Sequence, residues 1–500
     1  MEPKDRRIYL AVFGVLFVFL FVFFSRIHPV LMLDGDDWTY IAFAREALPA
    51  VGAWNPARVL PEILMPAVGA VAAHLVTPLL GDYLKAITVT YAFVIALVIL
   101  VYLICFSRFL TKVCRLGAVQ NVTVTALFLA VHFWVFRSGS TENSYLFHAR
   151  NLTCYFFYTI PTLLCAILVL LFEADPKIWD RASVTGKGVL LLAAYLAVYS
   201  NVFSSIVIAA YAGVVLLQKL LEKGAGKGFF KKLWEVLKEN AFFTGTVLAW
   251  LASFLFELTG GRADSVEQGR EDGSSVFSAL AESLGSMNKH FGLFVVAGCV
   301  FAAAVLIRSL RKKKAGNVTF YGARFFRFAA AAAVTAVYQL LLCGVTGLDH
   351  YLLCGDVLIT VFFYAFMALF TVLLYVLAEV PKAGALLPLA LCVAVSFCNT
   401  KEDTFQESNY YDGPSAVTAS VTEDVYRQVV DASAQGLTQV VVKVPVFDDP
   451  YNWPLSPYME SIVARSLYEH GQLAWPMEIT IVPDPQRNEL FGMELPAPVK

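Results

Sequence analysis

Three carboxylates lie close together near the N-terminus, directly after a long apolar segment. Asp34, Asp36 and Asp37 follow residues 8–24, which are nearly all Val, Leu and Phe. Because an acidic group is costly inside hydrocarbon, we expect this cluster at the water interface where the chain leaves the bilayer. A carboxylate there can act as general base for an acceptor hydroxyl, or share a divalent cation such as magnesium or manganese with a phosphate. The structural alternative is that Asp36 or Asp37 caps a helix beginning at Trp38.

Other polar side chains fall in segments that we expect on the same side of the membrane. Arginine there orients an acid or binds a phosphate, whereas a lone histidine is more often structural than catalytic. Two glycines before an arginine, in Gly260-Gly261-Arg262, let the backbone approach an anion that the guanidinium clamps. The alternatives are snorkelling of Arg58 to lipid head groups and tight-turn packing of His350. The candidate binding residues, besides Asp34, are Arg58, Glu62, Glu142, Asn143, His148, Arg262 and His350.

The composition is that of an all-α polytopic membrane protein. Of 500 residues, 58% are hydrophobic and 15% are charged, whereas a soluble protein of this length has about 25% charged residues. The nine Cys residues are scattered singly, and no Cys/His spacing predicts a zinc site. A net charge of -1 gives no sign of a nucleic-acid partner, and we expect none.

Apolar segments separated by basic loops predict about eleven membrane spans. The basic residues Lys4, Arg6 and Arg7 favour a cytoplasmic N-terminus. Residues 63–80 are apolar but interrupted by Pro66, His74 and Pro78, so we expect a helix that lies in or re-enters the outer interface within a long first outer loop, 25–84. The expected spans are 8–24, 86–110, 118–136, 151–172, 188–203, 204–218, 241–257, 291–307, 327–345, 356–378 and 384–398.

The segment from Lys219 to Lys238 has the pattern of a basic amphipathic helix, with aromatic residues among the lysines. Such a helix can lie on anionic lipid head groups, although a plain positive-inside anchor explains the same charges.

The composition changes after Cys398. Residues 399–500 are mostly polar, and their patterns predict helices at 422–436 and 461–470 and strands at 438–446 and 478–482. We therefore divide the chain into a transmembrane domain, 1–398, and a small extracytoplasmic α/β domain, 399–500.

This order of parts resembles the GT-C class of integral-membrane glycosyltransferases, and most closely the bacterial Gtr-type glucosyltransferases that modify surface polysaccharides. The resemblance rests on one span followed by the pair Asp36-Asp37, and on the stretch from Arg58 to Leu60 in a long outer loop. It extends to Glu142-Asn143 and Gly260-Gly261-Arg262, and to the small C-terminal domain.

The resemblance implies a catalytic transmembrane domain in the bacterial inner membrane, with the C-terminal domain outside the cytoplasm. It implies a polyprenyl-phosphate-linked sugar as donor and an envelope glycan or lipid as acceptor. Asp37 or Asp36 would take the proton of the attacking hydroxyl, and Arg58 or Arg262 would stabilise the departing lipid phosphate. Inverting transfer by single displacement is the simplest mechanism.

Two other classes remain as alternatives. A transporter or flippase of lipid-linked sugar typically places charges near mid-membrane and contains internal repeats, whereas here the charges gather at the ends of the spans and no matching halves stand out. A noncatalytic envelope scaffold would not need polar groups on several outer loops.

Overall fold

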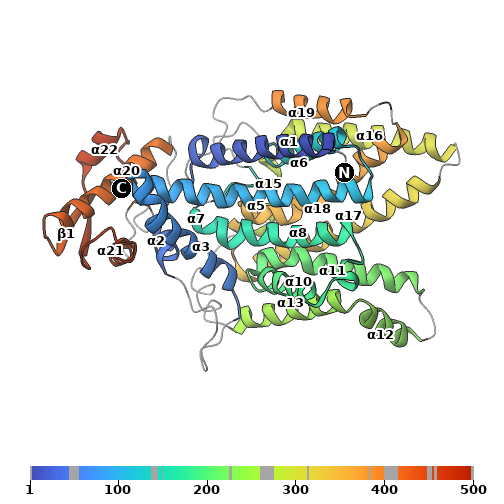
Figure 1. Cartoon of the computed structure of the whole chain (residues 1–500), viewed down its shortest axis with the longest axis horizontal. Helices are drawn as coiled ribbons and strands as arrows, with labels where there is room; N and C mark the ends of the chain where they lie inside the picture. The colour runs from blue at the N-terminus through green and yellow to red at the C-terminus, as the bar shows by residue number, and fades with distance from the viewer. Residues whose placement is uncertain are drawn as a thin grey trace.

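Long apolar helices run side by side through most of the molecule (Figure 1). The computed structural model describes residues 3–43, 56–136, 145–149, 151–224, 228–259, 275–311, 315–380, 382, 384–398, 415–447, 453–454 and 459–496. The long helices are α1 (Pro3–Val22), α5 (Tyr83–Val113), α6 (Ala118–His132), α8 (Ile160–Ala174), α10 (Val184–Val198), α11 (Val202–Glu222), α13 (Ala241–Thr259), α16 (Lys289–Arg311), α17 (Ala315–Thr346), α18 (Gly355–Glu379) and α19 (Leu386–Cys398).

Shorter elements connect these helices. They are η1 (Phe23–Ile27), α2 (Gly35–Ala42), α3 (Val59–Val71), η2 (Ala72–Val76), α4 (Thr77–Leu80), α7 (Leu152–Cys154), η3 (Tyr155–Thr159), α9 (Ile178–Arg181), α12 (Phe229–Glu239), α15 (Val276–Gly285) and η4 (Asp349–Leu353).

Within the described residues, eight helical stretches are long and apolar enough to cross a membrane, which makes this a multi-pass membrane protein. A ninth follows if α12 and α13, which meet at a bend of 96°, form one broken span. Each of the eleven expected spans coincides with a helix, but α6, α10 and α19 are shorter than the other spans. The number eleven and the orientation of the termini therefore stay predictions.

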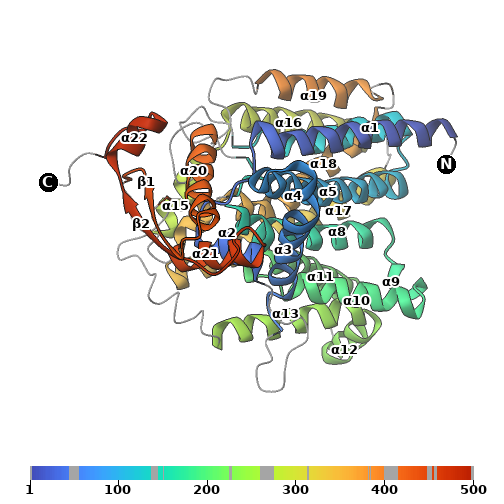
Figure 2. The same cartoon turned by 60° about the vertical axis from the view of Figure 1, so that its left-hand side comes forward.

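The expectation that prolines interrupt residues 63–80 is wrong. Val59–Leu80 is one continuous helical stretch, long and apolar enough to be counted among the eight. A π turn, η2, ends two residues before Pro78. Its wider turn relieves the clash between a proline ring and the carbonyl four residues earlier. The stretch begins with α3, which runs obliquely to α1 and α5 in both views (Figures 1 and 2).

The same device occurs at one other place. The π turn η3 ends two residues before Pro161, and the helix continues through this proline into α8. The π turn η1 also ends two residues before a proline, Pro29, but there the helix ends at Ile27.

A buried ion cluster ties together three spans at the opposite end of the bundle. The Glu173 carboxylate, at the end of α8, accepts hydrogen bonds from Tyr211 on α11 at 2.9 Å and from Arg327 on α17. Arg324 lies 3.7 Å from the same carboxylate. Breaking such a pair leaves an uncompensated buried charge, so the cluster fixes the packing of α8, α11 and α17.

The chain ends in a small α/β unit at the end of the bundle away from the N-terminus (Figures 1 and 2). We call it the outer unit after its predicted extracytoplasmic orientation. It consists of α20 (Ser415–Ala434), β1 (Gln439–Val444), α21 (Met459–Glu469), β2 (Glu478–Pro483) and α22 (Pro485–Phe491). The two strands pair in parallel, with Gln439 opposite Glu478. The expected helices and strands of this region are present, whereas α22 was not expected.

Candidate functional site

The acidic cluster belongs to the short helix α2 and the turn before it. Asp34 is the N-cap of α2, and its side chain accepts a hydrogen bond from the Asp37 backbone N–H at 3.0 Å. It also accepts a hydrogen bond from the amide nitrogen of Asn151. Helix capping, which the sequence suggested for Asp36 or Asp37, is therefore the role of Asp34, two positions before Asp36.

Asp37 is fully buried, contrary to the expectation that it faces water. Its Oδ2 accepts a hydrogen bond from the Leu33 N–H at 2.7 Å. Its Oδ1 accepts two from Thr153, one from the backbone N–H at 2.6 Å and one from the hydroxyl at 2.7 Å. Burial raises the pKa of the Asp37 carboxyl well above its usual range, and the neighbouring Asp34 adds to the shift. These contacts make Asp37 a clamp between α2 and the start of α7.

Asp36 lies in the first turn of α2 and is exposed to solvent. Because Asp34 and Asp37 are buried, Asp36 is the exposed carboxylate of the cluster. An exposed acid in the first turn also benefits from the partial positive charge at a helix N-terminus.

The outer unit holds α2 in place from one side. The Ser466 hydroxyl on α21 donates to the Trp38 carbonyl at 2.6 Å. The His470 imidazole lies between the Ile41 carbonyl, 3.1 Å from Nε2, and the Tyr83 hydroxyl, 2.7 Å from Nδ1. Because a carbonyl only accepts, Nε2 carries the proton and Nδ1 accepts from tyrosine.

Helix α3 supports α2 from another side. A Cβ built on Gly69 would stand 1.9 Å from the Ile41 carbonyl oxygen, so only glycine permits this crossing of α3 and α2.

Burial of the His470 imidazole, with His74 nearby, lowers its pKa to about 4.

Arg58 precedes α3 and pairs with a carboxylate that was not expected as its partner. Its guanidinium lies 3.0 Å from Glu257 near the end of α13. Its backbone, in the left-handed region at φ 60°, donates from N–H to the Tyr199 carbonyl at 2.6 Å. The ion pair uses one of the five guanidinium N–H groups, so the fork keeps donors for a second anion.

The other expected binding residues that the structure describes lie in three different segments of the chain. Glu62 is half-buried in the first turn of α3, and His350 is exposed in η4. His148 is buried, with its ring centroid 5.5 Å from those of His28 and Tyr145. Burial and the neighbouring His28 lower the pKa of His148 to about 3, which favours a neutral structural role. Glu142, Asn143 and Arg262 lie outside the described residues.

Sequence reasoning missed four residues that complete this region. Thr153 and Asn151 hold the aspartates, and Glu257 holds Arg58. Asp356 is buried in the first turn of α18, beside the Cys154 thiol. Two of them could have been found by their position in the sequence. Asn151 and Asp356 each stand at the start of an apolar helix, where capping side chains are typical.

Metal ligands do not gather here. Over the part of the chain that the structure describes, no group of three or more His, Cys, Asp or Glu side chains is arranged to hold a metal ion. Compared with known protein families, with characterised proteins and with solved structures, the chain shows no significant match.

Proposed function

We propose that the protein is a membrane glycosyltransferase that moves a sugar from a polyprenyl-phosphate-linked donor to an envelope glycan or lipid acceptor on the outer face of a bacterial inner membrane. The observation that carries this proposal is the exposed Asp36 on a helix fixed at one end of a multi-pass bundle. A lipid-linked donor and a water-borne acceptor can meet at such a place. The resemblance to GT-C glycosyltransferases supports the same reaction.

In the proposed reaction Asp36 is the general base. Its carboxylate takes the proton of the acceptor hydroxyl while the hydroxyl oxygen attacks the anomeric carbon of the sugar. The bond between that carbon and the phosphate oxygen breaks, and the lipid phosphate leaves with the electron pair. Arg58 stabilises the departing phosphate with guanidinium donors that the Glu257 pair does not use.

Asp37 has a positioning role in this proposal. It is not available to a hydroxyl in water, because it is fully buried and accepts three hydrogen bonds. By fastening α2 to Thr153 it fixes the direction in which Asp36 points, and a misplacement of about 1 Å can cost roughly a hundredfold in rate.

Release of polyprenyl phosphate tests the proposal. The purified protein in proteoliposomes is supplied with short-chain polyprenyl-phosphate hexoses and an envelope glycan extract, and the released lipid phosphate is measured. A general base contributes roughly 10² to 10⁴ in rate, so Asp36→Asn should lose about that much. Asp431→Asn removes another exposed acid, on α20 of the outer unit, and should keep the wild-type rate.

Glu257→Gln separates the two roles of Arg58. It breaks the ion pair but leaves the guanidinium, so it should retain more donor affinity than Arg58→Ala. Equal losses in both variants would mean that Arg58 only anchors α3 to α13. Wild-type release by Asp36→Asn would overturn the catalytic assignment, and sugar-lipid translocation without release would favour a flippase.

A further inference from the structure

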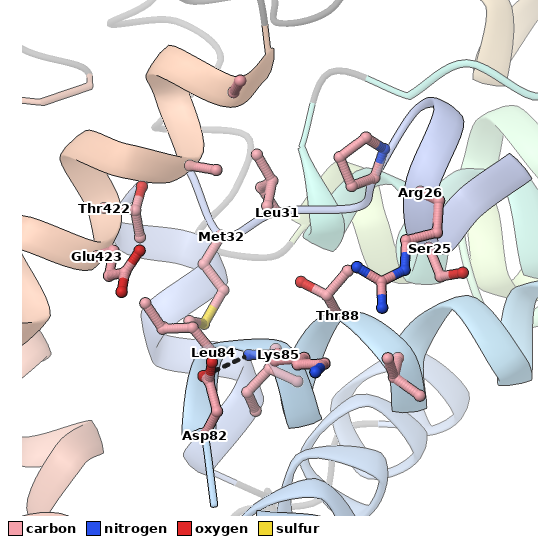
Figure 3. Close-up of a pocket in the computed structure, with 15 residues that line it drawn as sticks. Ser25, Arg26, Leu31, Met32, Asp82, Leu84, Lys85, Thr88, Thr422 and Glu423 are labelled. Carbon is pink, nitrogen blue, oxygen red and sulfur yellow. Dashed lines mark hydrogen bonds between the residues drawn. The ribbon is translucent and has the colours of Figure 1, made fainter. Parts of the chain in front are cut away.

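A pocket of about 410 Å³ lies apart from Asp36 and Arg58, between the outer ends of α1 and α5 and helix α20 of the outer unit (Figure 3). Ser25 and Arg26 line it from η1, and Lys85 and Thr88 line it from the first turns of α5. Glu423 reaches it from α20.

The charges in this pocket are separated by sign. Arg26, Lys85 and Thr88 lie at one side of it, and Asp82 and Glu423 lie at the other (Figure 3). Two cations that line one pocket repel each other, and a bound anion removes that repulsion. No salt bridge joins either cation to a carboxylate among the residues the structure describes.

Each cation lies beyond an apolar stripe, toward the end of the bundle that carries the outer unit. On α5, Phe93, Leu97 and Val101 are exposed at spacings of four residues, and Lys85 precedes Phe93 by eight residues, about 80° round the helix. At a rise of about 1.5 Å per residue, Lys85 lies roughly 12 Å beyond Phe93 along the helix. Arg26 follows Val22 and Val18 at the same spacing, and both of these valines are exposed.

These stripes belong to two candidate membrane spans that contact each other. The Phe17 and Phe93 rings pack edge to face at 5.4 Å between centroids. Acyl chains on the exposed stripes would place a lipid phosphate at the level of Arg26 and Lys85, where the hydrocarbon ends.

The acidic side of the pocket indicates a second charged group on the same head group. Asp82 uses Oδ1 to cap α5, accepting from the Lys85 backbone N–H at 3.0 Å, so its other oxygen can accept from a ligand. We propose that this pocket binds a zwitterionic bilayer phospholipid of the phosphatidylethanolamine class. Its phosphodiester lies against Arg26 and Lys85, and its primary ammonium donates to Asp82 and Glu423. This proposal does not rest on the proposed transferase activity.

Lipid retention measures the binding directly. The purified protein is exchanged into detergent with equimolar phosphatidylethanolamine, phosphatidylglycerol and phosphatidylcholine, and bound lipids are counted by native mass spectrometry. We expect preferential retention of phosphatidylethanolamine. Because charge-assisted hydrogen bonds are strong, the double variant Arg26→Gln/Lys85→Gln should weaken binding by about tenfold or more. Arg108→Gln/Lys112→Gln, at the other end of α5, removes the same charge and should not.

The acidic side has its own variant. Asp82→Asn/Glu423→Gln should abolish the preference over phosphatidylcholine, whose trimethylammonium cannot donate hydrogen bonds, while retention of phosphate lipids persists. Asn at position 82 keeps the helix cap, so folding is preserved. Equal retention of all three lipids, or a preference for phosphatidylglycerol, would overturn the proposal. Displacement of the bound lipid by stoichiometric polyprenyl phosphate would also overturn it, by assigning the pocket to the sugar donor.

Discussion

The contrast between Asp36 and Asp37 gives the sharpest prediction. Asp37 is buried against three donors, the backbone N–H groups of Leu33 and Thr153 and the Thr153 hydroxyl. In Asp37→Asn the side-chain NH₂ must face one of these two backbone N–H groups in either orientation. An unsatisfied buried donor costs about 1–3 kcal/mol, and the charge-assisted bond is lost as well, so we expect a destabilisation of roughly 3 kcal/mol.

Asp36→Asn should behave differently, because the side chain is exposed and such substitutions usually change the free energy of unfolding by less than about 0.5 kcal/mol. Thermal unfolding in detergent, followed by tryptophan fluorescence, compares the two proteins. The unfolding midpoint should fall clearly for Asp37→Asn and stay at the wild-type value for Asp36→Asn. Sugar transfer should be lost in Asp36→Asn.

Thr153→Val provides the control. It removes the hydroxyl but keeps the backbone N–H, so it should cost about 1 kcal/mol, the net value of one hydrogen bond. Its effect should be smaller when Asp37 is already Asn, because the two residues share the interaction. If Asp37→Asn unfolds at the wild-type midpoint and alone abolishes transfer, the buried aspartate acts in the chemistry and the assignment to Asp36 fails.

Three further predictions concern the elements around the site and are all measured by thermal unfolding. Gly69→Ala should destabilise the protein because its Cβ would meet the backbone of α2, whereas Gly213→Ala, with open space around it, should be neutral or stabilising. Stability should fall as the pH drops from about 6.5 to 4, by roughly 3 kcal/mol from His470 alone, since its pKa is lowered in the folded state and the unfolded chain binds the proton first; His470→Gln should flatten this dependence. Glu173→Gln should cost about 1–3 kcal/mol, because it leaves the half-buried Arg327 without its counter-charge; a wild-type midpoint would contradict this.

The sequence was a good guide where structure follows from local pattern. Apolar stretches of about twenty residues form helices whichever neighbours they meet, and each of the eleven expected spans is helical. The paired strands of the outer unit followed from alternation and flanking turns. The continuity of Val59–Leu80 was missed, because proline was taken as a helix breaker and the π turn before Pro78 has no recognised sequence signal.

The candidate site was less predictable because its decisive contacts are long-range. Asp37 is buried by Thr153, 116 positions away, and Arg58 is paired with Glu257, 199 positions away. From the local sequence, Asp36 and Asp37 are equivalent neighbours. On the folded helix they diverge by about 100°, so one meets α7 and the other meets solvent. The pattern therefore located the cluster, while only the tertiary packing distinguishes the clamp from the exposed acid.

The outer unit takes part in the same arrangement. Helix α2 has only eight residues, too few to be stable alone in water. It is held by Thr153 from the bundle, by the close crossing at Gly69, and by Ser466 and His470 from α21. Two of these residues belong to a unit that follows the last long helix. The outer unit and α2 thus pack as one structural element. The position of Asp36 therefore depends on segments near both ends of the chain.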